Sequence, residues 1–222
     1  MKRRYLLALL PTLLLFSGMA SADTLTVNCS TVTGPTELVA APMFCPQFNL
    51  GPGFALSNIG IAVSGGINGS ITLMNGSTAT QTGSGTTTTS FAFGALSGFT
   101  FVNPIFQATY TTGTQTLSAG QTLTVSGLTG TGSGSLGSNA TSFAAYTGSG
   151  NFIIPVSTST LFSAGGTGGS FTASQASNAN ATGVVTYTFS AVQAVPEPAT
   201  ISLLGLGLLG FRFMARKFKV VK

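Results

Sequence analysis

The sequence predicts an all-β protein: an antiparallel β-sandwich, immunoglobulin-like or jelly-roll-like, between an N-terminal signal peptide and a short C-terminal transmembrane helix. Three observations support this class. Hydrophobic residues make up 43% of the 222 residues and charged residues only 5%, a balance that favours a buried core over disorder. Alternating polar and apolar runs recur about every 8 to 15 residues between Gly, Pro and Asn turn signals. Before Ala199 no segment shows a helical period.

The first 22 residues have the three parts of a secretory signal peptide. These are the basic residues Lys2, Arg3 and Arg4, the apolar segment Leu6–Phe16 and the small-residue cleavage site Ala20-Ser21-Ala22. Cleavage after Ala22 makes Asp23 the first mature residue and implies export through the Sec machinery. The alternative, an uncleaved anchor, is disfavoured because the apolar run is shorter than the roughly 20 residues that a membrane span needs.

The formal net charge of +5 is a property of the chain ends. All Lys and Arg residues lie in the first four positions or from Arg212 onward, there is no His, and the acids are Asp23, Glu37 and Glu197. The exported part is therefore nearly neutral. It offers no basic surface to phosphates, which argues against a nucleic-acid partner.

Cys29 and Cys45 are the two cysteines, and both follow the signal peptide. In an oxidising compartment such a pair is expected to form a disulfide. Closing a loop of this length stabilises a fold by roughly 3 kcal/mol in the chain-entropy picture. No metal site is expected, because two thiols without His do not supply the usual ligand set.

The first half of the domain contains the clearest strand pattern. Leu25–Val27 predicts a first strand, and prolines then punctuate a looping region at Pro35, Pro42, Pro46 and Pro52. The apolar residues that follow share one parity, which predicts a half-buried β pair: Ile59, Ile61, Val63, Ile67, Ile71 and Leu73. Gly65-Gly66 is expected to form its turn or bulge, and Asn75-Gly76 a further turn.

The second half predicts further strands and two loops. Candidate strands are Thr86–Phe93, Phe99–Thr112 with a break near Pro104, Leu123–Val125, Phe152–Val156, Leu161–Phe162 and the strongly alternating Val185–Ala191. Gly127–Gly137 and Ser163–Gly169 are rich in Gly and Ser, so both are expected to be flexible loops.

The residue types that most active sites need are missing, so no catalytic residue, metal or cofactor is predicted. Without His there is no Ser-His-Asp triad, and without Lys in the domain there is no Schiff base. A glycosidase carboxylate pair could come only from Asp23 and Glu37. Two Gly-x-Gly-x-x-Gly matches lack the strand-turn-helix context of a dinucleotide site: Gly132, Gly134 and Gly137, and Gly205, Gly207 and Gly210.

Two features fit contact with extracellular polysaccharide. Thr-rich strand faces present hydroxyl groups, and three tyrosines could form a platform for sugar rings: Tyr110, Tyr146 and Tyr187. Packing in the core is the commoner role for such tyrosines. A carbohydrate-binding module is the alternative function on these grounds.

The C-terminal tail combines a stiff segment, an apolar run and a basic end. Pro196 and Pro198 favour extended backbone, after which a helix can begin at Ala199. The uncharged run to Phe211 is shorter than the roughly 17 residues that span a bilayer, so the helix would continue to about Ala215. The basic residues should stay cytoplasmic as a stop signal: Arg212, Arg216, Lys217, Lys219 and Lys222.

This tail resembles the PEP-CTERM sorting signal of bacterial exported proteins. The resemblance rests on the short helix, the basic end and the motif Val195, Pro196, Glu197, Pro198, Ala199, Thr200. It implies recognition by an exosortase, a membrane-embedded cysteine-dependent enzyme that would cut near the Pro-Glu-Pro and discard the helix. An ordinary membrane anchor that is never cut is the alternative.

A second resemblance concerns the domain itself. Phe44–Asn49, the segment from Ile59 to Asn75, and Val184–Phe189 look like the choice-of-anchor E group. Members of that group are exported domains attached to different surface-sorting tails. The resemblance implies no enzymatic activity.

These features predict three parts: a signal peptide (1–22), an exported β-sandwich domain (23–194) and a sorting tail (195–222). The predicted function is a non-enzymatic, biofilm-associated structural protein. It would be held in the inner membrane by its tail and then reach the cell surface or extracellular matrix of a Gram-negative-type bacterium. A hydrolase is a third possibility, which the absence of His, and of Lys and Arg between the chain ends, disfavours.

Overall fold

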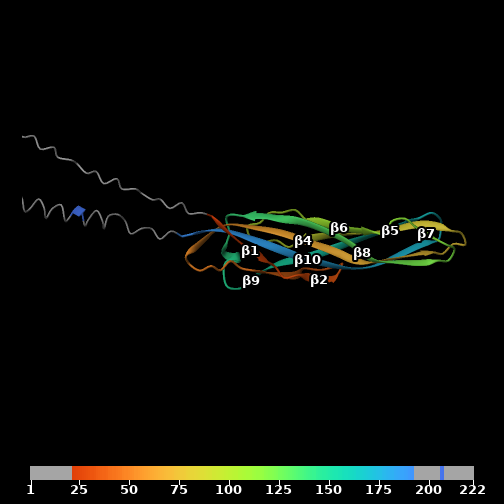
Figure 1. Ribbon diagram of the computed structural model, residues 1–222, viewed down its shortest axis with the longest axis horizontal. Coiled ribbons are helices and arrows are strands. Elements are labelled where there is room, and N and C mark those ends of the chain that lie inside the picture. The colour runs from red at the N-terminus through yellow and green to blue at the C-terminus, as the bar shows by residue number, and fades with distance from the viewer. Residues whose placement is uncertain (1–21, 193–205, 208–222) are drawn as a thin grey trace, which may run out of the picture. The chain divides into compact units, whose positions relative to one another are not determined.

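The computed structural model describes residues 22–192 and 206–207, and residues 22–190 form one compact unit (Figure 1). This unit is the predicted antiparallel β-sandwich. Its strands are β1 (Asp23–Asn28), β2 (Val32–Pro35), β3 (Ala41–Pro46), β4 (Phe54–Asn75), β5 (Gln81–Phe93), β6 (Phe106–Thr111), β7 (Gln115–Leu117), β8 (Thr122–Asn139), β9 (Asn151–Gly166) and β10 (Phe171–Ala191). A single 3-10 turn, η1 (Ala144–Tyr146), lies between β8 and β9.

The order of the strands is that of a jelly roll rather than an immunoglobulin domain. Sheet A has the order β1-β10-β4-β8, with β2 also paired to β10, and sheet B has the order β3-β9-β5-β6, with β7 also paired to β5. If β1 with β2 and β6 with β7 are each counted as one interrupted strand, eight strands remain, and each consecutive pair crosses between the sheets except β5 and β6, which are neighbours in sheet B. This is the order of two Greek keys in a jelly roll. The long strands β4 and β10 run side by side through the sandwich (Figure 1).

The period-two pattern of β4 supplies one side of the core, as predicted. The side chains with odd numbers are buried between the sheets: Ile59, Ile61, Val63, Ile67, Ile71 and Leu73. In sheet B, Phe91 and Phe93 point inward, and Phe91 stacks on Phe106 with ring centroids 4.6 Å apart. The core is therefore built from alternate residues of two facing sheets.

Gly65-Gly66 is neither a turn nor a bulge, so that prediction is wrong. Gly65 pairs with Gly132 and Gly66 with Thr131 inside a continuous ladder between β4 and β8. Both positions are crowded by neighbouring backbone. A Cβ on Gly65 would lie 2.5 Å from the carbonyl oxygen of Asn180, and one on Gly66 2.8 Å from that of Gly130. Glycine is needed here for close approach of strands, and not for reversal of the chain.

The predicted flexible loop Gly127–Gly137 is also wrong, because these residues form most of β8. The strand is irregular in two places, where its register against β4 shifts. At or beside these shifts lie two glycines with positive φ, Gly127 at 71° and Gly137 at 88°. They fit β-bulges, which glycine can form without steric strain.

The second predicted loop, Ser163–Gly169, is wrong in its first half. Phe152–Val156 and Leu161–Phe162, predicted as separate strands, belong to the single strand β9, which continues to Gly166. Only Thr167–Ser170 connect it to β10. The last strand is longer than predicted, since β10 begins at Phe171 and includes the alternating residues Val185–Ala191.

The two sheets approach closely where β8 faces β6. Gly130, Gly132 and Gly134 form alternate positions of β8 that point toward β6. A Cβ on Gly130 would overlap the Thr109 carbonyl, and one on Gly132 would lie 2.5 Å from the Gln107 carbonyl oxygen. Side chains of ordinary size would force the sheets apart, toward the usual separation of about 10 Å.

The predicted disulfide between Cys29 and Cys45 is present. It joins the segment between β1 and β2 of sheet A to β3 of sheet B, and both cysteines are buried. Two hydrogen bonds reinforce this link: the Ser30 amide donates to the Phe44 carbonyl (2.7 Å), and the Phe44 amide donates to Ser30 Oγ (2.9 Å).

The domain begins and ends at the same end of the sandwich, here called the base. Asp23 pairs with Phe189, so β1 starts where β10 finishes. The opposite end, the tip, consists of the connections β4–β5, β7–β8 and β9–β10. There Asn75 fixes the β4–β5 turn, because its side-chain amide donates to the carbonyls of Ala79 (2.8 Å) and Ser118 (2.9 Å).

Candidate functional site

The predicted sorting motif, Val195 to Thr200, and the predicted stop signal, Arg212, Arg216, Lys217 and Lys219, lie outside the described residues. The same holds for most of the predicted C-terminal helix. Among the residues that the structure describes, no helix is long and apolar enough to cross a membrane. The chain segment that leads to the motif leaves the sandwich at the base, where β10 ends at Ala191.

The predicted signal-peptide cleavage site also lies at the base. Ala22 and Asp23 are exposed, and Asp23 begins β1. Cleavage after Ala22 would leave the first strand complete. The predicted site is therefore compatible with the fold, since the mature chain would start with a residue that is already in the sheet.

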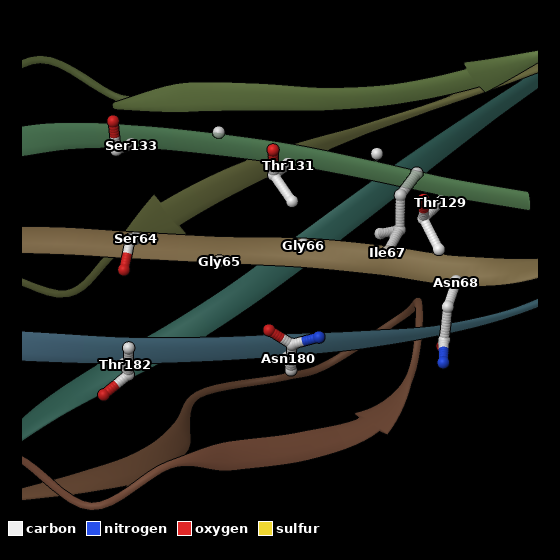
Figure 2. A pocket seen from close by; sticks show the side chains of 12 residues that line it. Ser64, Gly65, Gly66, Ile67, Asn68, Thr129, Thr131, Ser133, Asn180 and Thr182 are labelled. Carbon is white, nitrogen blue, oxygen red and sulfur yellow. The ribbon is translucent and has the colours of Figure 1, made fainter.

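A shallow groove of about 700 Å³ lies on the outer face of sheet A, over β8, β4 and β10 (Figure 2). We call it the sheet A groove. Its polar side chains are Ser64 and Asn68 of β4, Thr129, Thr131 and Ser133 of β8, and Asn180 and Thr182 of β10. The ladder brings these residues together, because Ser64 pairs with Ser133 and Asn68 with Thr129.

Glycine creates the depth of this groove. Gly65 and Gly66 lie along its middle, between the polar side chains of β8 and β10 (Figure 2). Gly66 is buried although it belongs to the outer face, since neighbouring strands crowd it. The groove therefore presents hydroxyl and amide groups around a floor of backbone.

The chemistry of the groove is that of an uncharged hydrogen-bonding site. Its hydroxyls can donate and accept, and the carboxamides of Asn68 and Asn180 can do both at once. Neither carboxamide forms a side-chain hydrogen bond within residues 22–192. Both are exposed and available to a ligand. Without a charged or titratable group, such a site can bind a neutral polar molecule but has no evident acid or base.

The outer face of sheet B carries a second hydroxyl-rich surface. Threonines of β5 and β6 pair across the strands, with Oγ1 to Oγ1 distances of 3.0 Å for Thr88 and Thr109 and 3.3 Å for Thr86 and Thr111. These cross-strand bonds stabilise the sheet. They also occupy part of the hydrogen-bonding capacity, so this face offers less to a ligand than the sheet A groove does.

The three tyrosines considered for sugar stacking are core residues. Tyr110, Tyr146 and Tyr187 are buried, with 4%, 1% and 0% of their surface exposed. Tyr187 donates to the Pro46 carbonyl (2.6 Å) and Tyr146 to the Ser97 carbonyl (2.7 Å). Burial raises the pKa of both phenols above the usual value, and for Tyr187 the neighbouring Tyr146 raises the pKa further. None of the three can form an exposed platform.

The two acids considered for hydrolysis are far apart. Asp23 pairs with Phe189 of β10, whereas Glu37 follows Pro35, which pairs with Asn178. Eleven positions along a strand (189 minus 178) correspond to roughly 36 Å at 3.3 Å per residue. Paired glycosidase carboxylates lie about 5 to 9.5 Å apart. Both acids are exposed, and Glu37 Oε1 accepts from the Thr160 amide (2.9 Å).

The glycine pattern of Gly132, Gly134 and Gly137 lies inside β8 and precedes no helix, so it is not a nucleotide loop. Sequence reasoning missed the sheet A groove because it interpreted these glycines as loop. A usable signal was present. Thr129, Thr131 and Ser133 alternate with glycine. This is the period-two pattern of a strand in which glycine takes the place of the apolar residues on the inward face.

Comparison with known proteins identifies one family feature. Residues 194–217 match the model of the PEP-CTERM protein-sorting motif. No curated protein matches the chain. Among solved structures, the chain is similar to one titled "Structure of infectious bursal disease virus Gx strain", at 11% identity and a TM-score of 0.20, over 91% of this chain and 51% of that one.

A crystal structure of the T13 particle of the same virus matches at 10% identity and a TM-score of 0.21, over 82% of this chain and 41% of that chain. The chain thus spans about half the length of the solved chains that it matches.

Proposed function

We propose that this chain, an exported protein sorted through a PEP-CTERM motif at residues 194–217, is a non-enzymatic structural component of the cell surface or extracellular matrix. The tail holds the protein in the inner membrane after export. An exosortase then cuts near Pro196-Glu197-Pro198, and the sandwich reaches its final place outside the cell. The single observation that carries this proposal is the sorting motif.

The architecture of the domain supports such a role. β10 ends at the base, where the tail begins, and the predicted mature N-terminus lies there too. The whole length of the sandwich therefore extends away from the point where the tail joins it. The strand β4 contains 22 residues, which corresponds to about 70 Å. A neutral, disulfide-linked sandwich of this length suits a passive spacer or matrix subunit.

The test is release of the full chain from an exosortase-containing host. Replacing Pro196, Glu197 and Pro198 with alanine should leave the uncut protein in the membrane fraction. The matched control replaces Val192 and Gln193, just before the motif, and should be released like the natural sequence. Unchanged release of the motif variant, judged by fractionation and intact mass, contradicts the proposal.

A second candidate function is binding of a neutral polysaccharide, and the sheet A groove favours it. The groove offers hydroxyls and two unoccupied carboxamides, the groups that pair with sugar hydroxyls, and it carries no charge that would select an ionic ligand. It also lies on the long face of the sandwich, where an extended polymer could lie across several strands.

Retention on polysaccharide separates this candidate from a purely structural role. We expect the exported protein to be retained on the neutral polymer of its host. Replacing Asn68 and Asn180 with alanine should weaken retention about tenfold, since each removes hydrogen bonds worth about 0.5 to 1.5 kcal/mol. Asn178→Ala, an exposed position of β10 outside the groove, is the control. Equal retention of all three proteins, or none by the natural sequence, rejects the groove.

A further inference from the structure

The outer edges of β9 in sheet B and of β10 in sheet A are unpaired over part of their length. β9 pairs with β5 on one side, and β3 covers its other side only from Asn151 to Val156. β10 is covered by β2 only from Asn178 to Ala181 and by β1 from Val184 to Phe189. Within residues 22–192, Leu161–Gly166 and Phe171–Ala176 therefore have no neighbouring strand on this side.

Several other edges of the sandwich carry features that hinder strand addition. Prolines interrupt two edge strands on the same side of the sandwich: Pro35 in β2, and Pro42 and Pro46 in β3. On the far side, β8 has its two register shifts, and β6 and β7 are only 6 and 3 residues long. Proline, bulges and short strands are the usual protections of edge strands.

The free edges of β9 and β10 have none of these protections. From Leu161 to Ala176 the sequence contains no proline and no charged residue, and both edge segments are regular strand. Exposed backbone amides and carbonyls of this kind are templates for another strand. Since the edges are neutral, two copies of them would not repel each other.

The positions of the two free edges would allow the same edges of a second copy to pair with them. Leu161–Gly166 and Phe171–Ala176 contain equal numbers of residues on either side of the turn Thr167–Ser170. Ser163 lies three positions before Gly166, and Ser174 three positions after Phe171. Both serines are exposed on the outer faces of their sheets. One two-fold axis through the level of these serines would therefore pair β9 with β9 and β10 with β10 at the same time.

We propose that two copies of this chain associate through the Leu161–Gly166 and Phe171–Ala176 edges, antiparallel about that axis, so that both sheets continue from one sandwich into the other. Such an interface is self-complementary and closed, which limits it to a dimer. About this axis five residues of each edge, 161–165 and 172–176, pair with their copies, which would add about four to six backbone hydrogen bonds per edge. The bases of the two copies then point in opposite directions.

The first test is the mass in solution of the exported protein, measured by light scattering over a range of concentrations. The natural sequence should give a dimer. Replacing Ser163 and Ser174 with lysine places like charges opposite each other at the axis, which should shift the mass to that of a monomer. Ser138→Lys adds a charge at an exposed position of β8, on the far side, and should leave the dimer unchanged.

The second test does not depend on disrupting the interface. Directly opposite residues of antiparallel strands have Cα atoms about 4.5 to 5.5 Å apart, within the range that a disulfide bridges. Ser174→Cys should therefore form a disulfide-linked dimer in the oxidising exterior, and Ser138→Cys should not. A monomeric mass at every concentration, or equal crosslinking of the two variants, overturns the proposal.

Discussion

At the scale of single residues, glycine determines how closely the sheets and strands of this sandwich approach. Gly130, Gly132 and Gly134 let the backbone of β6 pack directly on β8, and Gly65 and Gly66 allow crowding within sheet A. A sequence pattern cannot separate these roles from those of turn glycines, because glycine is also the usual residue of loops. The wrong predictions at Gly65-Gly66 and Gly127–Gly137 both have this cause.

We expect Gly130→Ala to lower the free energy of unfolding by about 1 to 3 kcal/mol, the usual effect of overpacking. Its Cβ would overlap the backbone of Thr109, which cannot move without moving β6. Gly60→Ala is the matched control, since a Cβ there would have no neighbour within 4 Å. Urea unfolding of the exported chain should show Gly60→Ala unchanged or slightly more stable. Equal effects of the two variants would contradict the role of Gly130.

At the scale of elements, the regular strands were predictable and the irregular ones were not. The parity of β4 from Ile59 to Leu73, the pair Phe91 and Phe93, and the alternation in Val185–Ala191 all reflect burial of one face, which leaves a mark in sequence. The middle of β8 packs against backbone, so its inward positions Gly130, Gly132 and Gly134 carry glycine instead of apolar side chains. Their strand character comes from neighbours that are distant in the chain.

At the scale of elements, we predict how much the disulfide between Cys29 and Cys45 contributes to stability. Replacing Cys29 and Cys45 with alanine should lower the free energy of unfolding by about 3 kcal/mol, since the bond closes a loop with a sequence separation of 16. Reduction of the natural protein should give the same loss. Denaturant unfolding with and without reductant makes this comparison. A reduced protein as stable as the oxidised one would show that the Ser30–Phe44 hydrogen bonds hold these segments without the bond.

At the scale of the whole molecule, the sequence predicted the sandwich, the disulfide and the sorting motif, because each has a local signature: periodicity, paired cysteines after a signal peptide, and Pro-Glu-Pro before an apolar run. The sheet A groove and the free edges of β9 and β10 have no local signature in the sequence. They arise only when β4, β8 and β10 are aligned and when β1, β2 and β3 stop short of the tip.

The position of β10 has a mechanical consequence. The tail follows β10 at the base, so tension applied to the tail enters the domain along the axis of its 21-residue last strand. β10 lies between β1 with β2 on one side and β4 on the other. A pull along this strand loads many ladder hydrogen bonds together in shear, and does not peel them apart one by one. A sandwich held by its tail, as in the function proposed above, would be loaded in the direction in which a β-sheet resists force best.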